Sequence, residues 1–237
     1  MYLITKTSVP NFYEGVKSFF FTPSIFLMKS LRLLLSRIRN KIELSKINGG
    51  DTVMKRKIGF IVGSLRKDSY SKKTAEAFEK LFSETIEIGY LTIGDLPFYN
   101  EDLETKNNVP QAWTFFRAEA AKYDAFVFFT PEYNRSVPAV LKNAIDVGSR
   151  PYGASIWDGK PALVVSVSIG AIAGFGANHH LRQALTFLNM PTLQQPEAYV
   201  GNVAKLLEAT SEFPEGTLAF FQTITDTYLD FVDKFIK

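Results

Sequence analysis

From residue 57 onward, short apolar runs alternate with segments of helical spacing, and this alternation limits the fold more than any other feature of the sequence. The clearest run is residues 124–130, which contains Ala125-Phe-Val-Phe-Phe129. Continuous apolar runs are typical of strands that are buried on both faces of a parallel sheet, whereas strands with one wet face alternate in polarity. The sequence therefore predicts an α/β domain in which right-handed crossover helices cover both faces of a parallel sheet.

The pattern predicts five strands and five helices. The expected strands are residues 57–63, 85–90, 124–130 and 161–167, and a fifth strand that ends at Tyr199-Val200. The expected helices are residues 70–82, 110–122, 136–147, 176–188 and 216–237. In an open sheet of this kind a ligand binds beyond the carboxyl ends of the strands, where the strand order reverses. Functional residues are therefore expected in the loops that leave the strands.

The first 53 residues do not follow this pattern. They carry eight basic and three acidic side chains, whereas residues 54–237 carry 19 basic and 21 acidic ones. Residues 54–237 thus lack the electrostatic footprint of a nucleic-acid-binding protein. Within residues 1–53, no apolar run reaches the roughly 18 residues of a membrane-spanning helix. Because Met54-Lys-Arg-Lys-Ile begins like a bacterial α/β protein, we interpret residues 1–53 as a non-native or disordered extension and residues 54–237 as one domain. A basic membrane-surface segment is the alternative.

The sequence contains no cysteine and only two histidines, His179 and His180. Disulfides, thiolate nucleophiles and iron–sulfur sites are therefore excluded, and a metal site is not expected. A cysteine-free chain fits the reducing cytoplasm, where we expect this protein. The histidine pair could donate a proton to a reduced acceptor, or it could lie at a helix start, on the surface or at a subunit contact.

A hydroxyl-rich loop follows the first strand and opens a helix. It reads Gly63-Ser-Leu-Arg-Lys-Asp-Ser-Tyr-Ser-Lys72. N–H groups at the start of a helix bind phosphate readily, and the side chains that could assist them are Ser64, Arg66, Ser69 and Ser71. The loop lacks the Gly-Lys-Ser/Thr of a Walker A loop and the three glycines of the dinucleotide fingerprint. It suits a monophosphate such as that of FMN; the alternative is an ordinary capped helix start.

A second loop leaves the strand at residues 124–130 as Pro131-Glu-Tyr-Asn134, followed by Arg135-Ser-Val-Pro-Ala-Val-Leu-Lys-Asn-Ala-Ile-Asp146. A turn of this composition beside a sheet edge presents an aromatic face and backbone donors. Such a turn can pack against a planar ring and hydrogen-bond its polar edge. A surface turn that caps a helix would explain Asn134 and Ser136, but not the whole string.

These two strings resemble the NADPH-dependent FMN reductase family, which includes bacterial quinone and chromate reductases. The family pattern is Gly-Ser-x-Arg-x-x-Ser after the first strand and Pro-Glu-Tyr-Asn-x-Ser-x-Pro-x-x-Leu-Lys-Asn-Ala-Ile-Asp after the third. The resemblance spans about residues 55–200 and implies a flavodoxin-like fold, bound FMN, and a homodimer or homotetramer. It implies that the FMN phosphate is held by Ser64, Arg66, Ser69 and Ser71. It also implies that the isoalloxazine ring is lined by Pro131, Glu132, Tyr133 and Asn134.

A third loop, residues 166–177, resembles the flavin-edge loop of the same family. Its glycines would let backbone amides approach the ring closely, and Ser168 and Gly170 are the expected contacts. Three positions depart from the family pattern. Ala139 and Ala173 stand where glycine is usual, and the tryptophan or other aromatic residue that is usual near Val147-Gly148 is missing. These departures bear on the shape of the substrate pocket rather than on FMN binding.

The resemblance also implies a mechanism, in which NADPH or NADH passes a hydride to FMN and leaves before a small acceptor binds in its place. The acceptor would be a quinone, free flavin, chromate or a similar molecule, and the kinetics would be ping-pong. Because the flavin carries the redox chemistry, no side-chain base is required. Backbone amides of residues 132–134 or 168–170 could stabilise negative charge on the reduced ring. Two alternatives stay open: a flavodoxin-like electron carrier, which the near-neutral charge and Arg66 disfavour, and a redox-sensing partner protein.

Overall fold

The computed structural model describes residues 55–105, 108–207 and 212–236. The segment 1–53, for which we expected a non-native or disordered extension, lies outside the described residues. Within the described part, five parallel strands form one sheet in the order β2-β1-β3-β4-β5. The strands are β1 (Arg56–Val62), β2 (Ile86–Tyr90), β3 (Ala125–Pro131), β4 (Ala162–Val167) and β5 (Ala198–Val200). The predicted five-stranded parallel sheet is thereby confirmed.

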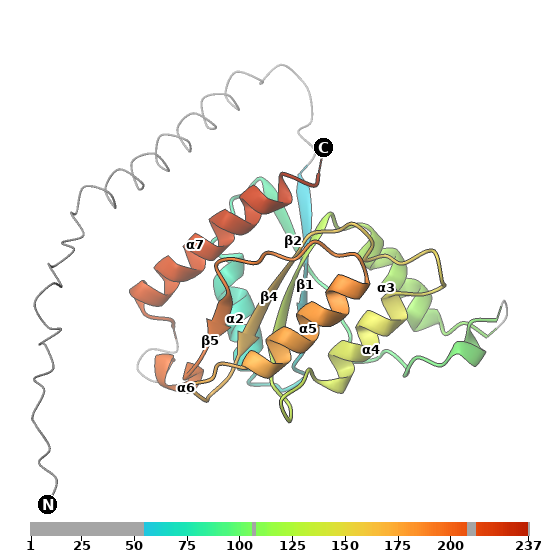
Figure 1. Ribbon diagram of the computed structural model, residues 1–237, viewed down its shortest axis with the longest axis horizontal. Helices are drawn as coiled ribbons and strands as arrows, with labels where there is room; N and C mark the ends of the chain where they lie inside the picture. Colours follow the sequence, from blue (N-terminus) through green and yellow to red (C-terminus); the bar gives the residue numbers. More distant parts are fainter. Residues whose placement is uncertain (1–54, 106–107, 208–211, 237) are drawn as a thin grey trace, which may run out of the picture. The chain divides into compact units, whose positions relative to one another are not determined.

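Helices cover both faces of this sheet (Figure 1). One face packs against α2 (Tyr70–Glu79) and α7 (Glu215–Val232). The other face packs against α3 (Gln111–Ala121), α4 (Ala139–Gly148) and α5 (Phe175–Phe187). The sequence pattern did not predict the 3₁₀ helix η1 (Glu101–Leu103) or the short α6 (Val203–Leu206), and it extended α2 and α7 too far, to residues 82 and 237. Among the described helices, none combines the length and the apolar character needed to cross a bilayer.

The central strand β3 contributes to the core on both faces because its side chains alternate. Val127 and Phe129 join the cluster under α2 and α7, whereas Phe126 and Phe128 join the cluster under α3, α4 and α5. All four side chains are fully buried. Burial of a side chain of this size stabilises a protein by about 1.5–3 kcal/mol. The end of β3 is therefore a firmly placed point from which the next turn leaves the sheet.

The helix that we expected from Ser136 begins at Ala139 instead, so that prediction was wrong at its start. Tyr133 and Ser136 exchange two backbone hydrogen bonds of 2.9 Å, which close a two-residue turn. Its central residues, Asn134 and Arg135, have φ of 50° and 65°, as a type I′ turn requires. Ser136 is thus part of this turn, and the helix can begin only after it.

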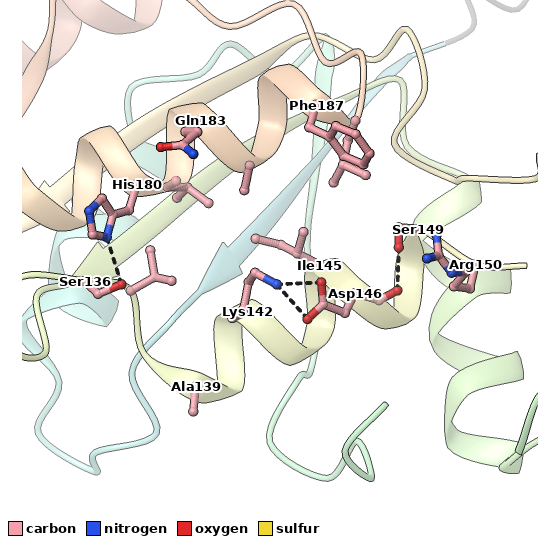
Figure 2. A pocket seen from close by; sticks show the side chains of 14 residues that line it. Ser136, Ala139, Lys142, Ile145, Asp146, Ser149, Arg150, His180, Gln183 and Phe187 are labelled. Carbon is pink, nitrogen blue, oxygen red and sulfur yellow. Dashed lines mark hydrogen bonds and ion pairs between the residues drawn. The ribbon is translucent and has the colours of Figure 1, made fainter. Parts of the chain in front are cut away.

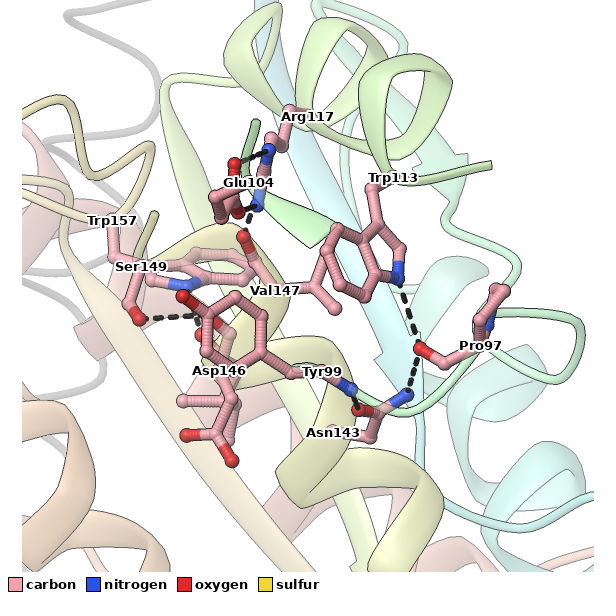
Figure 3. A network of polar contacts seen from close by, with 11 residues as sticks. Pro97, Tyr99, Glu104, Trp113, Arg117, Asn143, Asp146, Val147, Ser149 and Trp157 are labelled. Carbon is pink, nitrogen blue, oxygen red and sulfur yellow. Dashed lines mark hydrogen bonds and ion pairs between the residues drawn. The ribbon is translucent and has the colours of Figure 1, made fainter. Parts of the chain in front are cut away.

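The loop between β2 and α3 is held against α4 by Asn143 (Figure 3). The side-chain oxygen of Asn143 accepts a hydrogen bond from the Tyr99 N–H at 2.8 Å. Its Nδ2 donates to the carbonyl oxygens of Leu96 and Pro97, each at 3.1 Å, and the Trp113 indole donates to Pro97 as well. Both polar groups of this buried amide are satisfied, as buried amides require. Asn143 of the second sequence string therefore serves the fold.

Candidate functional site

The loops that follow β1, β3 and β4 enclose a cavity of about 180 Å³ at the carboxyl edge of the sheet. The chain order reverses here, because β2 lies on one side of β1 and the later strands lie on the other. Seven of the ten predicted site residues line the cavity: Ser64, Arg66, Ser71, Pro131, Glu132, Tyr133 and Ser168. The three that do not are Ser69, Asn134 and Gly170. The sequence prediction and the tertiary structure thus converge on one place.

The first loop presents the N-terminus of α2 to this cavity. Ser69 is buried and caps the helix, since its Oγ accepts a hydrogen bond from the Lys72 N–H at 3.1 Å. The N–H groups of Tyr70 and Ser71 lie in the first turn, where no intrahelical acceptor exists. Both residues line the cavity. Unpaired N–H groups and the positive end of the helix dipole together favour an anion at this point.

Among the described residues that line this cavity, Arg66 is the only basic one. Its side chain is exposed, and it forms no ion pair with any residue that the structure describes. A guanidinium without a partner keeps its donors available for phosphate oxygens. The loop therefore offers a cation, hydroxyl groups and helix N–H donors, which is the donor set that a phosphate monoester needs.

Glu132 lines the cavity, but its carboxylate is engaged within the protein. Its Oε2 accepts a hydrogen bond from the Ala177 N–H of α5 at 3.2 Å, and its Oε1 accepts one from Arg135 Nη1 at 3.1 Å. Arg135 and the positive end of α5 thus offset its charge. An anion in the cavity consequently meets little repulsion from Glu132, whose main contact fastens the β3–α4 turn to α5.

This contact between the turn and α5 depends on glycine at position 176. A Cβ atom there would lie 2.6 Å from the Arg135 carbonyl oxygen and 3.0 Å from Glu132 Oε2. At 2.6 Å from a backbone oxygen, an added methyl group would force the turn or the helix to shift. The absence of a side chain therefore lets the start of α5 approach the turn closely enough for the Ala177 N–H to reach Glu132.

The third loop is held by hydrogen bonds of its own. The Ser168 N–H donates to the Val200 carbonyl at 2.9 Å, and the Gly170 N–H donates to Ser168 Oγ at 3.1 Å. Ser166 Oγ donates to the Ala173 carbonyl at 2.8 Å. Ala173 has φ of 57°, a left-handed conformation that favours glycine. This conformation gives a physical reason for the glycine that is usual at this position in the family that the sequence resembles.

Four lining residues were not among the predicted contacts: Tyr70, Val167, Ile169 and Val203. Tyr70 and Ile169 lie within loops that the sequence had marked. Val203 belongs to the short α6 after β5, and no motif pointed to it. Tyr133 is half exposed at the cavity, whereas Asn134 lies at the tip of the turn.

Neither histidine lines this cavity. His180 Nδ1 lies 3.0 Å from Ser136 Oγ, which links α5 to the turn after β3 (Figure 2). His179 Nε2 lies 3.2 Å from the Tyr199 hydroxyl oxygen. Both side chains therefore connect elements at the surface of α5.

The model of the NADPH-dependent FMN reductase family matches residues 56–205. The chain belongs to this family. A quinone reductase from Pseudomonas putida is 53% identical over 175 residues, which cover 74% of this chain and 94% of that protein. A 2-hydroxy-1,4-benzoquinone reductase from a Burkholderia species is 38% identical over 177 residues, which cover 74% of this chain and 96% of that protein.

Among solved structures, this family member is similar to FerB, a flavoenzyme NAD(P)H:(acceptor) oxidoreductase from Paracoccus denitrificans. The TM-score is 0.70 and the identity 37%, with 76% of this chain and 98% of the FerB chain covered. The flavodoxin-like fold is thereby confirmed. The chain is an enzyme of the NAD(P)H-dependent FMN reductase and quinone reductase type, as its sequence strings predicted.

Gly176→Ala should destabilise this FMN reductase by about 1–3 kcal/mol, because the new methyl group overpacks the contact between α5 and the turn. The matched control is Gly216→Ala, since each glycine is the second residue of its helix and Gly216 has no atom within 4 Å of the added methyl. Without a steric conflict, alanine stabilises a helix by about 0.5–1 kcal/mol. Urea unfolding measures both changes. A stabilising effect at both positions would show that the close approach at Gly176 is not tight.

Proposed function

We propose that the chain binds FMN at the carboxyl edge of the sheet and uses it to oxidise NAD(P)H and reduce a small acceptor such as a quinone. The proposal is carried chiefly by one observation: Arg66 and the start of α2 line the same cavity as Tyr133 of the turn after β3, and Arg66 pairs with no acidic residue in the described part of the chain. This pairs a phosphate-binding end with an aromatic surface. The names of the Pseudomonas, Burkholderia and Paracoccus proteins support the same chemistry.

The FMN phosphate would be held by Ser64, Arg66, Ser71 and the first N–H groups of α2. Ser69 would act indirectly, because its hydroxyl oxygen caps the helix and so fixes where those N–H groups lie. No carboxylate among the described residues forms an ion pair with the guanidinium of Arg66. These features fit a dianionic group better than a neutral one.

The ring of the cofactor would lie against Pro131, Tyr133 and Ile169. When bound, FMN supplies the redox chemistry by accepting a hydride from NAD(P)H and passing two electrons to the acceptor. The protein then needs only to bind and orient the reactants. Glu132 is the one carboxylate among the described lining residues, and Ala177 and Arg135 already hold it. It is therefore a positioning residue rather than a base.

The backbone N–H groups near the proposed site of the isoalloxazine ring differ in whether they are free to donate a hydrogen bond to it. The N–H groups of Tyr133, Ser168 and Gly170 already donate within the protein. Those of Asn134 and Ile169 donate to no acceptor among the described residues. We therefore assign to Asn134 and Ile169 the role of stabilising negative charge on the reduced ring, which preorganised N–H donors do well.

Steady-state and anaerobic kinetics test the reaction. If NAD(P)H leaves before the acceptor binds, double-reciprocal plots at several fixed quinone concentrations should be parallel. NADPH should bleach the flavin absorbance at least as fast as the enzyme turns over. A flavin that stays oxidised would instead favour an electron carrier or a redox-sensing protein. Intersecting lines with rapid bleaching would overturn only the ping-pong order.

Arg66→Ala should weaken FMN binding by about 1.5–3 kcal/mol, the usual contribution of a hydrogen bond to a charged group. Lys67→Ala is the matched control, because Lys67 is an exposed cation in the same loop that does not line the cavity. Titration of each apoprotein with FMN measures the difference. Equal affinity for the two variants would remove Arg66 from the phosphate site.

We further propose that the chain forms a homodimer or a dimer of dimers through a groove between α4 and α5 (Figure 2). The groove has a volume of about 850 Å³, and its lining includes Val137, Ile145, Leu181 and Phe187. Phe187 is 88% exposed. Large exposed aromatic residues in an apolar groove mark interaction surfaces. Lys142 and Asp146, which form an ion pair, are among the polar residues of the lining.

Light scattering at micromolar concentration should give two or four times the mass of one chain. Phe187→Glu should shift the protein toward the monomer, because it places a charge in the apolar contact. Phe220→Glu is the control, since Phe220 is an exposed phenylalanine on α7, which covers the opposite face of the sheet. A wild-type monomer with full activity would contradict this assembly.

A further inference from the structure

A separate cavity of about 360 Å³ lies between the end of β2, the loop that follows it, and α3. It shares no lining residue with the candidate flavin cavity or with the α4–α5 groove. Its volume falls within the range of about 300–1,000 Å³ that small-molecule sites occupy. The proposed oxidoreductase reaction uses none of its residues.

Aromatic rings form much of the wall of this cavity. They belong to Tyr90, Phe115, Phe116 and Tyr123. Phe116 is buried, whereas Phe115 is 68% exposed and Tyr90 is 42% exposed. The Tyr90 hydroxyl donates a hydrogen bond to Glu79 at 2.8 Å, outside the lining. The faces of aromatic rings carry partial negative charge and attract cations within about 6 Å.

The charged side chains in the lining have one sign. They are the carboxylates of Asp95 and Glu119, and none of the described lining residues is a lysine, arginine or histidine. Glu119 pairs with Lys122, while Asp95 forms no ion pair with any described residue. Burial raises the pKa of the Tyr123 hydroxyl. The Glu119 and Glu87 carboxylates raise it further, whereas Lys57 and Lys122 act in the opposite direction. Asp95 is therefore the charged group of the lining for which no described residue supplies a counter-ion.

The walls of the cavity are held in place by the rest of the domain. Tyr123 lies directly against the β2 backbone, because a Cβ atom at Gly89 would come 1.9 Å from its hydroxyl oxygen. On the other side, Leu96 is fixed through its carbonyl, which accepts a hydrogen bond from Asn143 at 3.1 Å. Because the wall is fixed before binding, the protein loses less conformational entropy when a ligand binds.

We propose that this cavity binds a small organic cation with an apolar or aromatic body, that is, a protonated amine or a quaternary ammonium compound. The positive group lies toward Asp95, and the apolar body lies against Phe115 and Tyr90. The charge of the lining disfavours anions, which separates this site from that of FMN and NAD(P)H. The two sites therefore take ligands of opposite charge.

Benzyltrimethylammonium is a suitable probe for the full-length protein as purified, with neutral benzyl alcohol and anionic phenylacetate as matched compounds. Ligand-observed NMR titration should show saturable binding of the cation. We expect the neutral compound to bind at least about fivefold more weakly and the anion to bind more weakly still, given the usual strength of cation–π and charge contacts. No saturation up to about 10 mM, or equal binding of the neutral compound, would overturn the proposal.

Two variants locate the site. Phe115→Ala and Asp95→Asn should each weaken binding of the cation by about fivefold, since one removes an aromatic wall and the other the unpaired charge. Phe98→Ala and Asp102→Asn are the matched controls, because both residues are exposed and neither lines the cavity. We expect the controls to bind like the wild type. Equal weakening by a variant and its control would place the probe elsewhere and refute the assignment.

Discussion

β3 pairs with β1 on one side and with β4 on the other, and its side chains are buried on both faces of the sheet. The loops that follow β1 and β4 take their positions from this strand. The Gly63 N–H donates to the Phe129 carbonyl at 2.8 Å, so the phosphate loop departs from β1 beside the end of β3. Ser166 and Val167 of β4 pair with Thr130 and Pro131. The burial of one apolar strand thus brings three loops to one cavity.

Many residues of the string at positions 131–146 stabilise the turn after β3. Glu132 accepts the N–H of Ala177, the backbones of Tyr133 and Ser136 pair, and Asn134 adopts positive φ. Further along, Asn143 fastens the loop after β2. A precise turn places Tyr133 beside the cavity, and the side chains around it keep the turn from moving. Structural and binding roles are therefore shared out among neighbouring residues of the string.

The two cavities and the groove discussed above differ in the charge of their lining residues. Arg66 and the start of α2 make the candidate flavin cavity receptive to phosphate. The cavity beside α3 has Asp95 and Glu119 as its charged groups. The α4–α5 groove contains both signs, with Lys142 paired to Asp146. Since charge complementarity governs which partners approach a surface, these three places suit an anionic cofactor, an organic cation and a second copy of the chain.

The sequence by itself determined the α/β class, the five strands and the loops that carry most of the cavity lining, because periodicity and turn composition act between residues close in the chain. It could not place the start of α4, since Arg135 takes a positive φ that arginine rarely adopts. Only the tertiary structure decided that the Ala177 N–H donates to the carboxylate of Glu132, 45 residues earlier in the chain. It also decided that Val203 lines the candidate flavin cavity. The same holds for the cavity beside α3. Such contacts depend on how separate elements pack, and no local pattern of residues encodes a contact between positions far apart in the chain.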